Sequence, residues 1–210
     1  MLRPMCVTLL AAACAVGCKS DTPAPAPSAA AEPAPVSSAK GTDPAAVKIL
    51  TLDPAASTFA FDAAKITRTH HGSFKQFSGT ATLVGDELQA VTVEVETPSI
   101  EADDPKLTGH LQSPDFLDVQ KFPKATFKSS SIVAKPSGAH THEVSGALTL
   151  HGVTENITFP ATVRVAPASV TGSGEVRIDR KKFGVVYPGL PDDLIKDEVV
   201  LRPSFVFARK

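Results

Sequence analysis

Hydrophobic and polar residues alternate with a period of two over most of the chain from Val47 onward. In residues 91–96 valines alternate with Thr and Glu, and in residues 157–165 apolar residues alternate with Thr, Pro and Arg. This period gives each segment one buried face and one solvent-exposed face, which is typical of antiparallel strands. Clusters of Gly, Asp, Pro and Ser between the segments predict hairpins. We predict seven to nine strands.

Two stretches interrupt the alternation. Between Asp103 and Phe122, leucines recur at helical spacing and Pro105 suits the start of a helix, so a short helical insertion is predicted near residues 104–118. Residues 186–196 are rich in Pro, Gly and Asp. This composition predicts a long loop that could gate the interior.

Strands with one solvent-exposed face must bury the other face, so they pack as two sheets or close into a barrel. An eight-stranded barrel has an interior that side chains fill, or that holds one small ligand. The predicted fold class is therefore all-β and antiparallel, and periodicity alone does not choose between the sandwich and the barrel.

The first eighteen residues carry a targeting signal. Arg3 precedes an apolar stretch over residues 5–16, which is typical of a secretory signal and too short to span a bilayer. The sequence Ala-Val-Gly-Cys at residues 15–18 resembles the lipobox of bacterial lipoproteins, which implies cleavage after residue 17 and a diacylglyceryl group on Cys18. Residues 11–14 are a weaker competitor, and a plain secretory signal is the alternative.

Residues 18–46 are dominated by Pro, Ala and Ser without apolar periodicity, which predicts a disordered tether. One domain follows over residues 47–210. The lipobox implies a lipoprotein of the cell envelope that faces the periplasm. Lys19 stands where Asp is associated with retention at the inner membrane, so the outer membrane is favoured.

Composition excludes several functions. The formal net charge is −1 and the 21 Lys and Arg residues are scattered, so binding to nucleic acid is not predicted. The 11 Phe residues, with one Tyr and no Trp, suit an apolar interior. All three cysteines lie within the first 18 residues, so the domain has neither a disulfide nor a Cys-based metal site or nucleophile.

Catalytic motifs are weak. His140 and His142 alternate on one strand face and could share a metal ion, but zinc catalysis normally takes three protein ligands and a solvated hairpin is the favoured alternative. The pairs Asp103-Asp104 and Asp192-Asp193 fit caps of turns or helices better than acid–base pairs. No G-x-S-x-G nucleophile elbow occurs. We predict no enzyme, no metal and no cofactor.

Five segments together resemble the YceI-like family of bacterial periplasmic proteins. They are residues 69–79 (THHGSFKQFSG), 107–116 (LTGHLQSPDF), 122–127 (FPKATF), 146–154 (GALTLHGVT) and 180–184 (RKKFG). The resemblance implies a closed or nearly closed lipocalin-like barrel of about eight strands around a long isoprenoid chain, such as a quinone or polyprenyl tail. It implies a carrier, a reservoir or a stress-related sequestering protein, and it allows a homodimer.

The inward positions of the strands are the candidate lining of the ligand cavity. They are Phe59, Phe61, Val93, Phe127, Leu148, Phe159, Val176, Ile178, Phe205 and Phe207. By motif position the candidates for the cavity mouth and the ligand head group are His70, His71, His110, Arg180 and Lys182. Phe74, Phe77 and Phe116 are candidate plugs of the barrel ends. The alternative is a structural or interaction lipoprotein whose barrel has a solid core.

Overall fold

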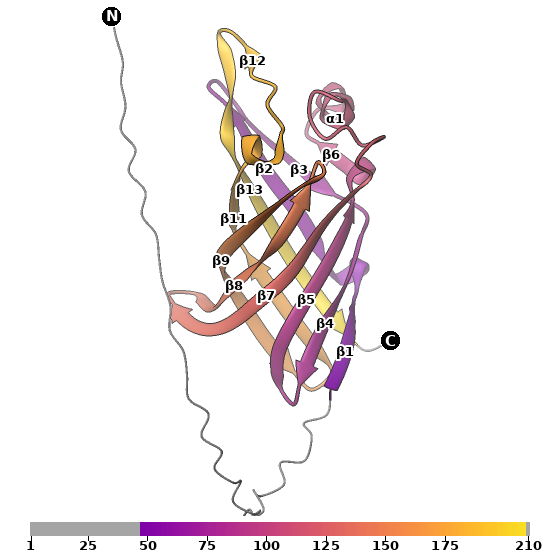
Figure 1. The fold of residues 1–210 in the computed structure, drawn as a ribbon, viewed down its shortest axis with the longest axis vertical. Coiled ribbons are helices and arrows are strands. Elements are labelled where there is room, and N and C mark those ends of the chain that lie inside the picture. Colours follow the sequence, from indigo (N-terminus) through magenta and orange to yellow (C-terminus); the bar gives the residue numbers. More distant parts are fainter. Residues whose placement is uncertain (1–46, 209–210) are drawn as a thin grey trace, which may run out of the picture. The chain divides into compact units, whose positions relative to one another are not determined.

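Residues 47–208, the part that the computed structural model describes, form thirteen strands, one α-helix and three short 3₁₀-helices (Figure 1). The strands are β1 (Val47–Leu52), β2 (Thr58–Lys65), β3 (Thr69–Phe74), β4 (Phe77–Val84), β5 (Glu87–Glu96), β6 (Ile100–Ala102), β7 (Lys124–Ser137), β8 (His140–Leu150), β9 (Val153–Ala166), β10 (Ser169–Gly174), β11 (Val176–Asp179), β12 (Gly189–Leu190) and β13 (Asp193–Ala208). The helices are η1 (Pro54–Ala56), η2 (Thr97–Ser99), α1 (Pro105–Gln112) and η3 (Arg180–Phe183). The predicted signal peptide (residues 1–17), the lipid attachment at Cys18 and the tether (residues 18–46) lie outside the described residues.

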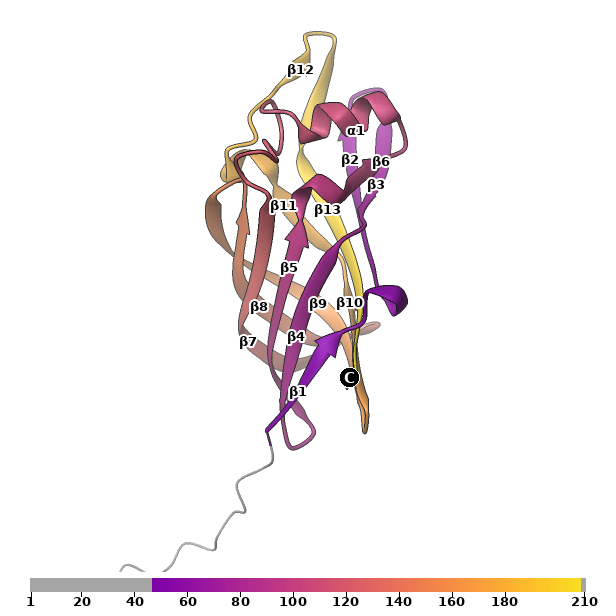
Figure 2. The same cartoon turned by 90° about the vertical axis from the view of Figure 1, so that its right-hand side faces the viewer.

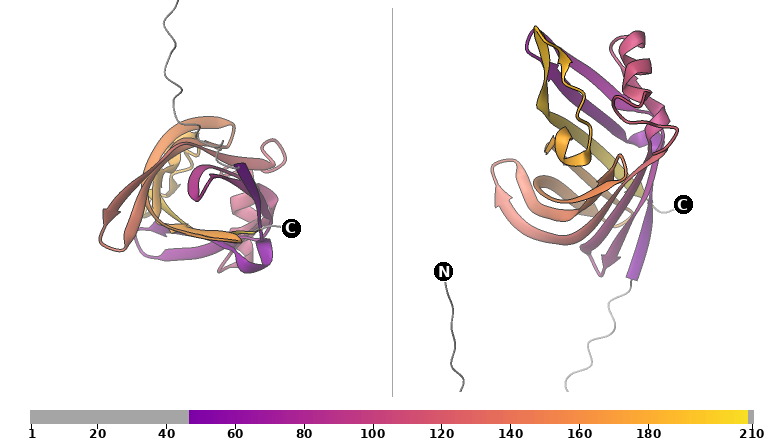
Figure 3. Two further views of the ribbon diagram at one scale, coloured as in Figure 1. Left: turned by 90° about the horizontal axis from the view of Figure 1, so that it is seen from below. Right: turned by 45° about the horizontal axis from the view of Figure 1, so that its top comes forward.

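Eight of these strands form a ring, in the order β1-β4-β5-β7-β8-β9-β10-β13. The ring closes because β13 also pairs with β1, through Thr51 with Ala208 and Leu52 with Phe207. Seen along its axis in Figure 3, the chain surrounds a single interior. The predicted closed antiparallel barrel of about eight strands is confirmed, and the sandwich is excluded.

The backbone ladder of the ring is interrupted on one side. Strand β10 pairs with β9 as far as Gly174 and Ala161, but β11, which follows it, pairs with β13. Pro160, the next residue on β9, has no N–H to donate, which suits the end of a ladder. Beyond it the side chains of Ile157, Val176 and Ile178 belong to one apolar cluster. We call this interruption the β9–β11 seam.

Helix α1 lies at the end of the barrel opposite to the start of β1 (Figure 2). The Asp104 carboxylate accepts hydrogen bonds from the backbone N–H groups of Lys106 and Leu107, which caps the helix N-terminus. The helix ends at Gln112 because Pro114 cannot donate a helical hydrogen bond. The predicted helical insertion near residues 104–118 is confirmed, and its second half forms turns.

The prediction of a long loop over residues 186–196 is wrong. Strand β12 pairs with the start of β13, and Ile195 N–H donates to the Pro188 carbonyl at 3.0 Å, which makes a β-hairpin. Pro, Gly and Asp favour tight turns as well as loops, so composition alone did not separate the two. The hairpin projects beyond the ring at the α1 end (Figure 1).

Candidate ligand-binding cavity

The interior of the barrel contains a cavity of about 230 Å³ with an almost wholly apolar lining. Strands β2, β5, β7 to β11 and β13 supply most of its wall. At the α1 end the wall is completed by Leu111, Phe116 and Leu117, and by Val185 after η3. The interior is therefore not packed solid, contrary to the alternative of a solid core.

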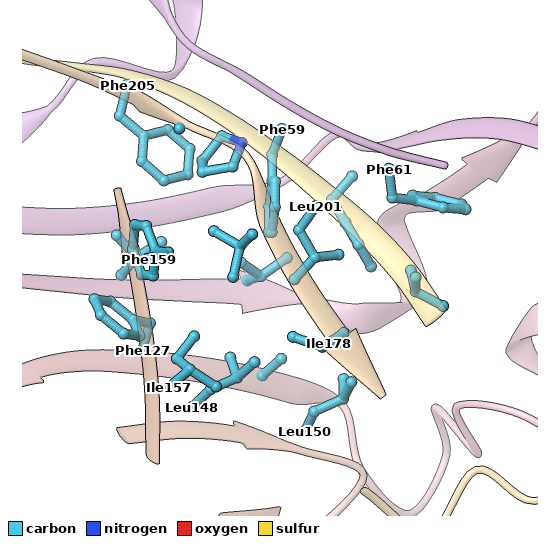
Figure 4. A pocket seen from close by; sticks show the side chains of 18 of the residues that line it. Phe59, Phe61, Phe127, Leu148, Leu150, Ile157, Phe159, Ile178, Leu201 and Phe205 are labelled. Carbon is cyan, nitrogen blue, oxygen red and sulfur yellow. The ribbon is translucent and has the colours of Figure 1, made fainter. Parts of the chain in front are cut away.

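Aromatic rings form much of the wall (Figure 4). Phe59 contacts Phe205 edge-on, with ring centroids 5.8 Å apart, and it also contacts Phe74 at 5.3 Å. Away from this group, Phe127 and Phe159 lie 5.7 Å apart on β7 and β9. The rings of Phe127 and Phe159 face inward yet are only half-buried. Empty space, rather than protein, borders part of their surface.

All ten positions predicted to face the interior line this cavity. They are Phe59, Phe61, Val93, Phe127, Leu148, Phe159, Val176, Ile178, Phe205 and Phe207. That these side chains bind a ligand stays a prediction.

Sequence reasoning missed other lining residues. Leu150, Ile157 and Leu201 also line the cavity and follow the same alternation, so the same rule could have found them. Leu117 and Val185 come from irregular segments, where a period of two gives no direction.

Arg180 is the single charged side chain in the cavity lining formed by residues 47–208. It is 4% exposed. The Asp179 carboxylate caps the N-terminus of η3, which begins with Arg180. The guanidinium donates to the backbone carbonyls of Val185 (Nη1, 2.7 Å), Lys196 (Nε, 3.1 Å) and Ile195 (Nη2, 3.3 Å).

The second N–H of Arg180 Nη2 donates to Asp197 Oδ1 at 3.4 Å. Four of the five guanidinium N–H donors thus have partners among the described residues, and one on Nη1 remains. Arg180 therefore ties η3 and the nearby Val185 to β13.

The other four candidates for the mouth do not line the cavity, and that they contact a ligand head group stays a prediction. Three histidines face carboxylates instead: His70 Nδ1 lies 2.9 Å from Asp103, His71 Nδ1 2.6 Å from Asp62, and His110 Nε2 3.0 Å from Asp115. Lys182 is exposed. Motif position placed these residues near the α1 end but gave no side-chain direction.

The hydrogen bond from His70 is the main cause that holds the pKa of the Asp103 carboxyl below its usual range. Partial burial opposes this shift, and the nearby charges of His70 and Arg68 add to it. Because Asp103 leads into α1, these contacts fasten the helical insertion to β3.

Three rings meet at the α1 end of the cavity. His110 lies edge-on to Phe116 (4.8 Å between centroids) and to Tyr187 (5.1 Å), and Phe116 lies 5.3 Å from Tyr187. Of the predicted plugs, Phe74 and Phe116 line the cavity, whereas Phe77 does not and instead contacts Phe205 at 5.5 Å. The ring cluster joins α1 to the segment that leads into β12.

His140 and His142 lie two residues apart on β8, and His142 Nδ1 is 2.7 Å from the Thr141 hydroxyl. Within residues 47–208 no group of three or more His, Cys, Asp or Glu side chains is placed to hold a metal ion. The same residues contain no helix that is long and apolar enough to cross a membrane.

An eight-stranded antiparallel barrel around one apolar cavity defines the lipocalin-like class, whose architecture suits apolar ligands. Within that class, the model of the YceI-like domain matches residues 50–207. The chain belongs to the YceI-like family, as its five motif segments indicated.

Curated relatives include UPF0312 proteins of Pseudomonas. That of Pseudomonas putida strain W619 is 42% identical over 94 residues, which cover 44% of this chain and 48% of the relative. That of Pseudomonas savastanoi pv. phaseolicola is 35% identical over 127 residues, or 57% of this chain and 65% of the relative. The chain thus spans about half the length of the Pseudomonas putida relatives that it matches.

Several solved structures share the fold. BcnA of Burkholderia cenocepacia is 27% identical with a TM-score of 0.64, and the match covers 74% of this chain and 98% of that one. A polyisoprenoid-binding domain from Saccharophagus degradans is 17% identical with a TM-score of 0.61, and the match covers 76% of this chain and 98% of that one. The second likeness is one of fold alone.

Proposed function

We propose that the barrel binds a long apolar lipid, an isoprenoid quinone or a polyprenyl chain, as a carrier or reservoir in the cell envelope. The apolar cavity is the observation that carries this proposal. Burial of hydrocarbon yields about 25 cal/mol per Å² and demands no particular polar partner, so a wall of Phe, Leu, Ile and Val is sufficient. The proposed role is binding rather than catalysis.

Arg180 is the proposed contact for the polar end of the ligand. Among residues 47–208 it is the one charged residue of the lining, although its side chain is buried and the surface that faces the cavity is almost wholly apolar. A few polar groups in an apolar pocket typically fix the orientation of a ligand.

Gly172 offers a direct test, because it lines the cavity and a Cβ built on it would meet no atom within 4 Å. Gly172→Phe should project a ring into the cavity and displace the lipid while the barrel stays folded. Thr171→Phe is the matched control, since Thr171 is the exposed neighbour on the same strand. The measurement is mass spectrometry of lipid extracted from protein purified without detergent.

We expect about one apolar lipid per chain in the wild type and in Thr171→Phe, and little in Gly172→Phe. A wild type without bound lipid that also fails to take up an added isoprenoid quinone contradicts the proposal. Equal lipid content in Gly172→Phe and Thr171→Phe, both folded by circular dichroism, would place the lipid outside the cavity.

We also propose that Cys18 carries the lipid anchor and that the protein faces the periplasm, preferentially at the outer membrane. The lipobox-like residues 15–18 support this. Metabolic labelling with a fatty-acid probe should mark the wild type and not Cys18→Ala. Equal labelling of the two, or labelling of neither, contradicts the anchor.

A further inference from the structure

Exposed apolar side chains gather at the α1 end of the barrel. Four of the eight exposed large hydrophobic residues in the described chain lie there: Ile66 (65% exposed), Val186 (63%), Leu190 (59%) and Leu194 (45%). We call these four the apolar rim. They occupy the β2–β3 turn and the β12–β13 hairpin with the segment before it, which project beyond the ring (Figures 1 and 2).

The two projecting hairpins are fastened to each other. Ile66 N–H donates to the Leu194 carbonyl at 3.1 Å, and the Thr67 hydroxyl donates to Asp193 Oδ1 at 2.9 Å. Lys65 Nζ lies 3.4 Å from the other Asp193 oxygen. The rim is therefore held by backbone and side-chain bonds, and its apolar side chains are displayed on an ordered support.

The rim is continuous with the wall of the cavity. Val185 lines the cavity and its neighbour Val186 is exposed, while Ile195 lines the cavity and its neighbour Leu194 is exposed. On β13, Leu194 and Ile195 point to opposite sides because adjacent residues of a strand do so. The same two segments thus present apolar side chains to the ligand space and to the outside.

Several cations near the rim face carboxylates. Besides Lys65 with Asp193, Arg68 lies 3.4 Å from Asp103 and Lys181 lies 3.0 Å from Asp197. The exposed side chains of Lys182, Asp192 and Lys196, which carry both signs, also lie in these segments. The four rim side chains themselves are all apolar, so apolar contact is the means of recognition that they offer.

We propose that the apolar rim inserts into the interfacial region of a phospholipid bilayer and holds the α1 end of the cavity against the hydrocarbon. Four side chains are too few for the roughly 800 Å² per partner of a stable protein interface. An apolar surface that enters about 5–10 Å into the headgroup and acyl boundary is enough for a bilayer. The reason for this contact, the exchange of an apolar ligand, rests on the proposed function.

A fluorescent probe tests the contact at one position at a time. In the full chain, Cys6, Cys14 and Cys18 are replaced by Ser, which also removes lipid attachment, and an environment-sensitive probe is placed on Leu190→Cys. The matched control carries the probe on Val47→Cys, because Val47 is 65% exposed at the opposite end of the barrel. Vesicles are phosphatidylcholine, with and without brominated acyl chains.

Insertion of the rim predicts that brominated lipid quenches the probe at position 190 at least about threefold more than the probe at position 47. Added phosphatidylglycerol should change the quenching little, since the rim is not ionic. Equal quenching at the two positions, or none at 190, overturns the proposal. A concentration-dependent blue shift at 190 without vesicles identifies a second copy of the chain as the occupant and overturns it as well.

Substitution of rim residues by Glu gives an independent test of insertion. Leu190→Glu with Leu194→Glu should lower the vesicle partition coefficient at least about tenfold, since two leucines would no longer be buried. Val47→Glu with Ile49→Glu should leave it within about twofold, and a similar loss in both pairs contradicts the rim. The lipid content of each variant is measured separately from vesicle binding. If the barrel contains no lipid but the rim still inserts into vesicles, the proposed function is refuted and this inference is supported.

Discussion

Two walls of the barrel follow the same alternation and pack in opposite ways. On the β1–β4 wall, Leu50, Leu52 and Leu83 are 2–3% exposed and do not line the cavity. On the β7–β9 wall, Phe127 and Phe159 also face inward, but they are half-buried and border the cavity. An inward position therefore does not distinguish a core residue from a residue that lines a cavity.

Glycines show how the difference arises. A Cβ on Gly79 of β4 would collide with the Thr92 carbonyl oxygen and would lie 3.4 Å from Leu52 Cδ1, because neighbouring groups already fill the space beside it. A Cβ on Gly172 of β10 would meet nothing within 4 Å. Gly79 on the packed wall is thus covered by its neighbours, whereas Gly172 on the cavity wall is left uncovered.

The largest effect is expected on the packed wall. Leu50→Ala should lower the free energy of unfolding by about 3 kcal/mol, because it removes a fully buried side chain and leaves a hole that the neighbours cannot fill. Denaturant unfolding measures this change. A loss below about 1 kcal/mol would mean that the two walls do not differ.

The two glycines should respond with opposite signs. Gly79→Ala should destabilise the barrel by about 2 kcal/mol through overpacking. Gly172→Ala should be neutral or stabilising by about 0.5 kcal/mol, since it restricts the unfolded chain without a clash. Thermal unfolding of the ligand-free proteins gives both values, and equal losses would contradict the open space beside Gly172.

Phe159→Ala should destabilise the ligand-free barrel by about 1–2 kcal/mol, less than the 3–5 kcal/mol usual for a buried Phe, because one side of the ring already borders empty space. Its ligand affinity should fall at the same time. Denaturant unfolding with a parallel binding titration separates the two effects. A loss as large as that of Leu50→Ala would indicate a packed core at this position.

The smallest effect should come from Asp103, which fastens α1 over the cavity. Its pKa is lowered in the folded state, so its stabilisation is fully present above the unfolded value of about 4 and is lost as the pH falls through the lower folded value. The difference in Tm between the wild type and Asp103→Asn should therefore shrink below about pH 4.

Asp86, in the β4–β5 turn of the packed wall, is the control for Asp103. Its side chain is 89% exposed and lies 3.6 Å from Lys48, so Asp86→Asn should leave Tm unchanged at every pH. A pH-independent difference between the wild type and Asp103→Asn would show that the carboxyl of Asp103 acts through shape and not through charge.

Local pattern was enough to predict the strands and the inward positions, whereas the choice of a barrel over a sandwich came from the resemblance to the YceI-like family. The pattern could not distinguish Leu50, which is packed in the core, from Phe159, which lines the cavity. The cavity exists only once the barrel has closed, and closure requires Leu52 to pair with Phe207, 155 residues further along the chain. The motif at residues 180–184 pointed to Arg180, but its burial depends on carbonyls of β13. His71 lay in a motif too, yet it faces Asp62 on the outer surface, where motif position gives no direction.

The last strand has a consequence for how the protein is made. Strand β13 contacts β1, β2, β10, β11 and β12, and its final residues complete the ring. Because β13 follows every other described element, synthesis delivers it after them, and until then the seven other ring strands can form only an open, concave apolar sheet. Closure of the cavity therefore depends on β13, and loss of residues 205–208 would leave a trough in place of a container.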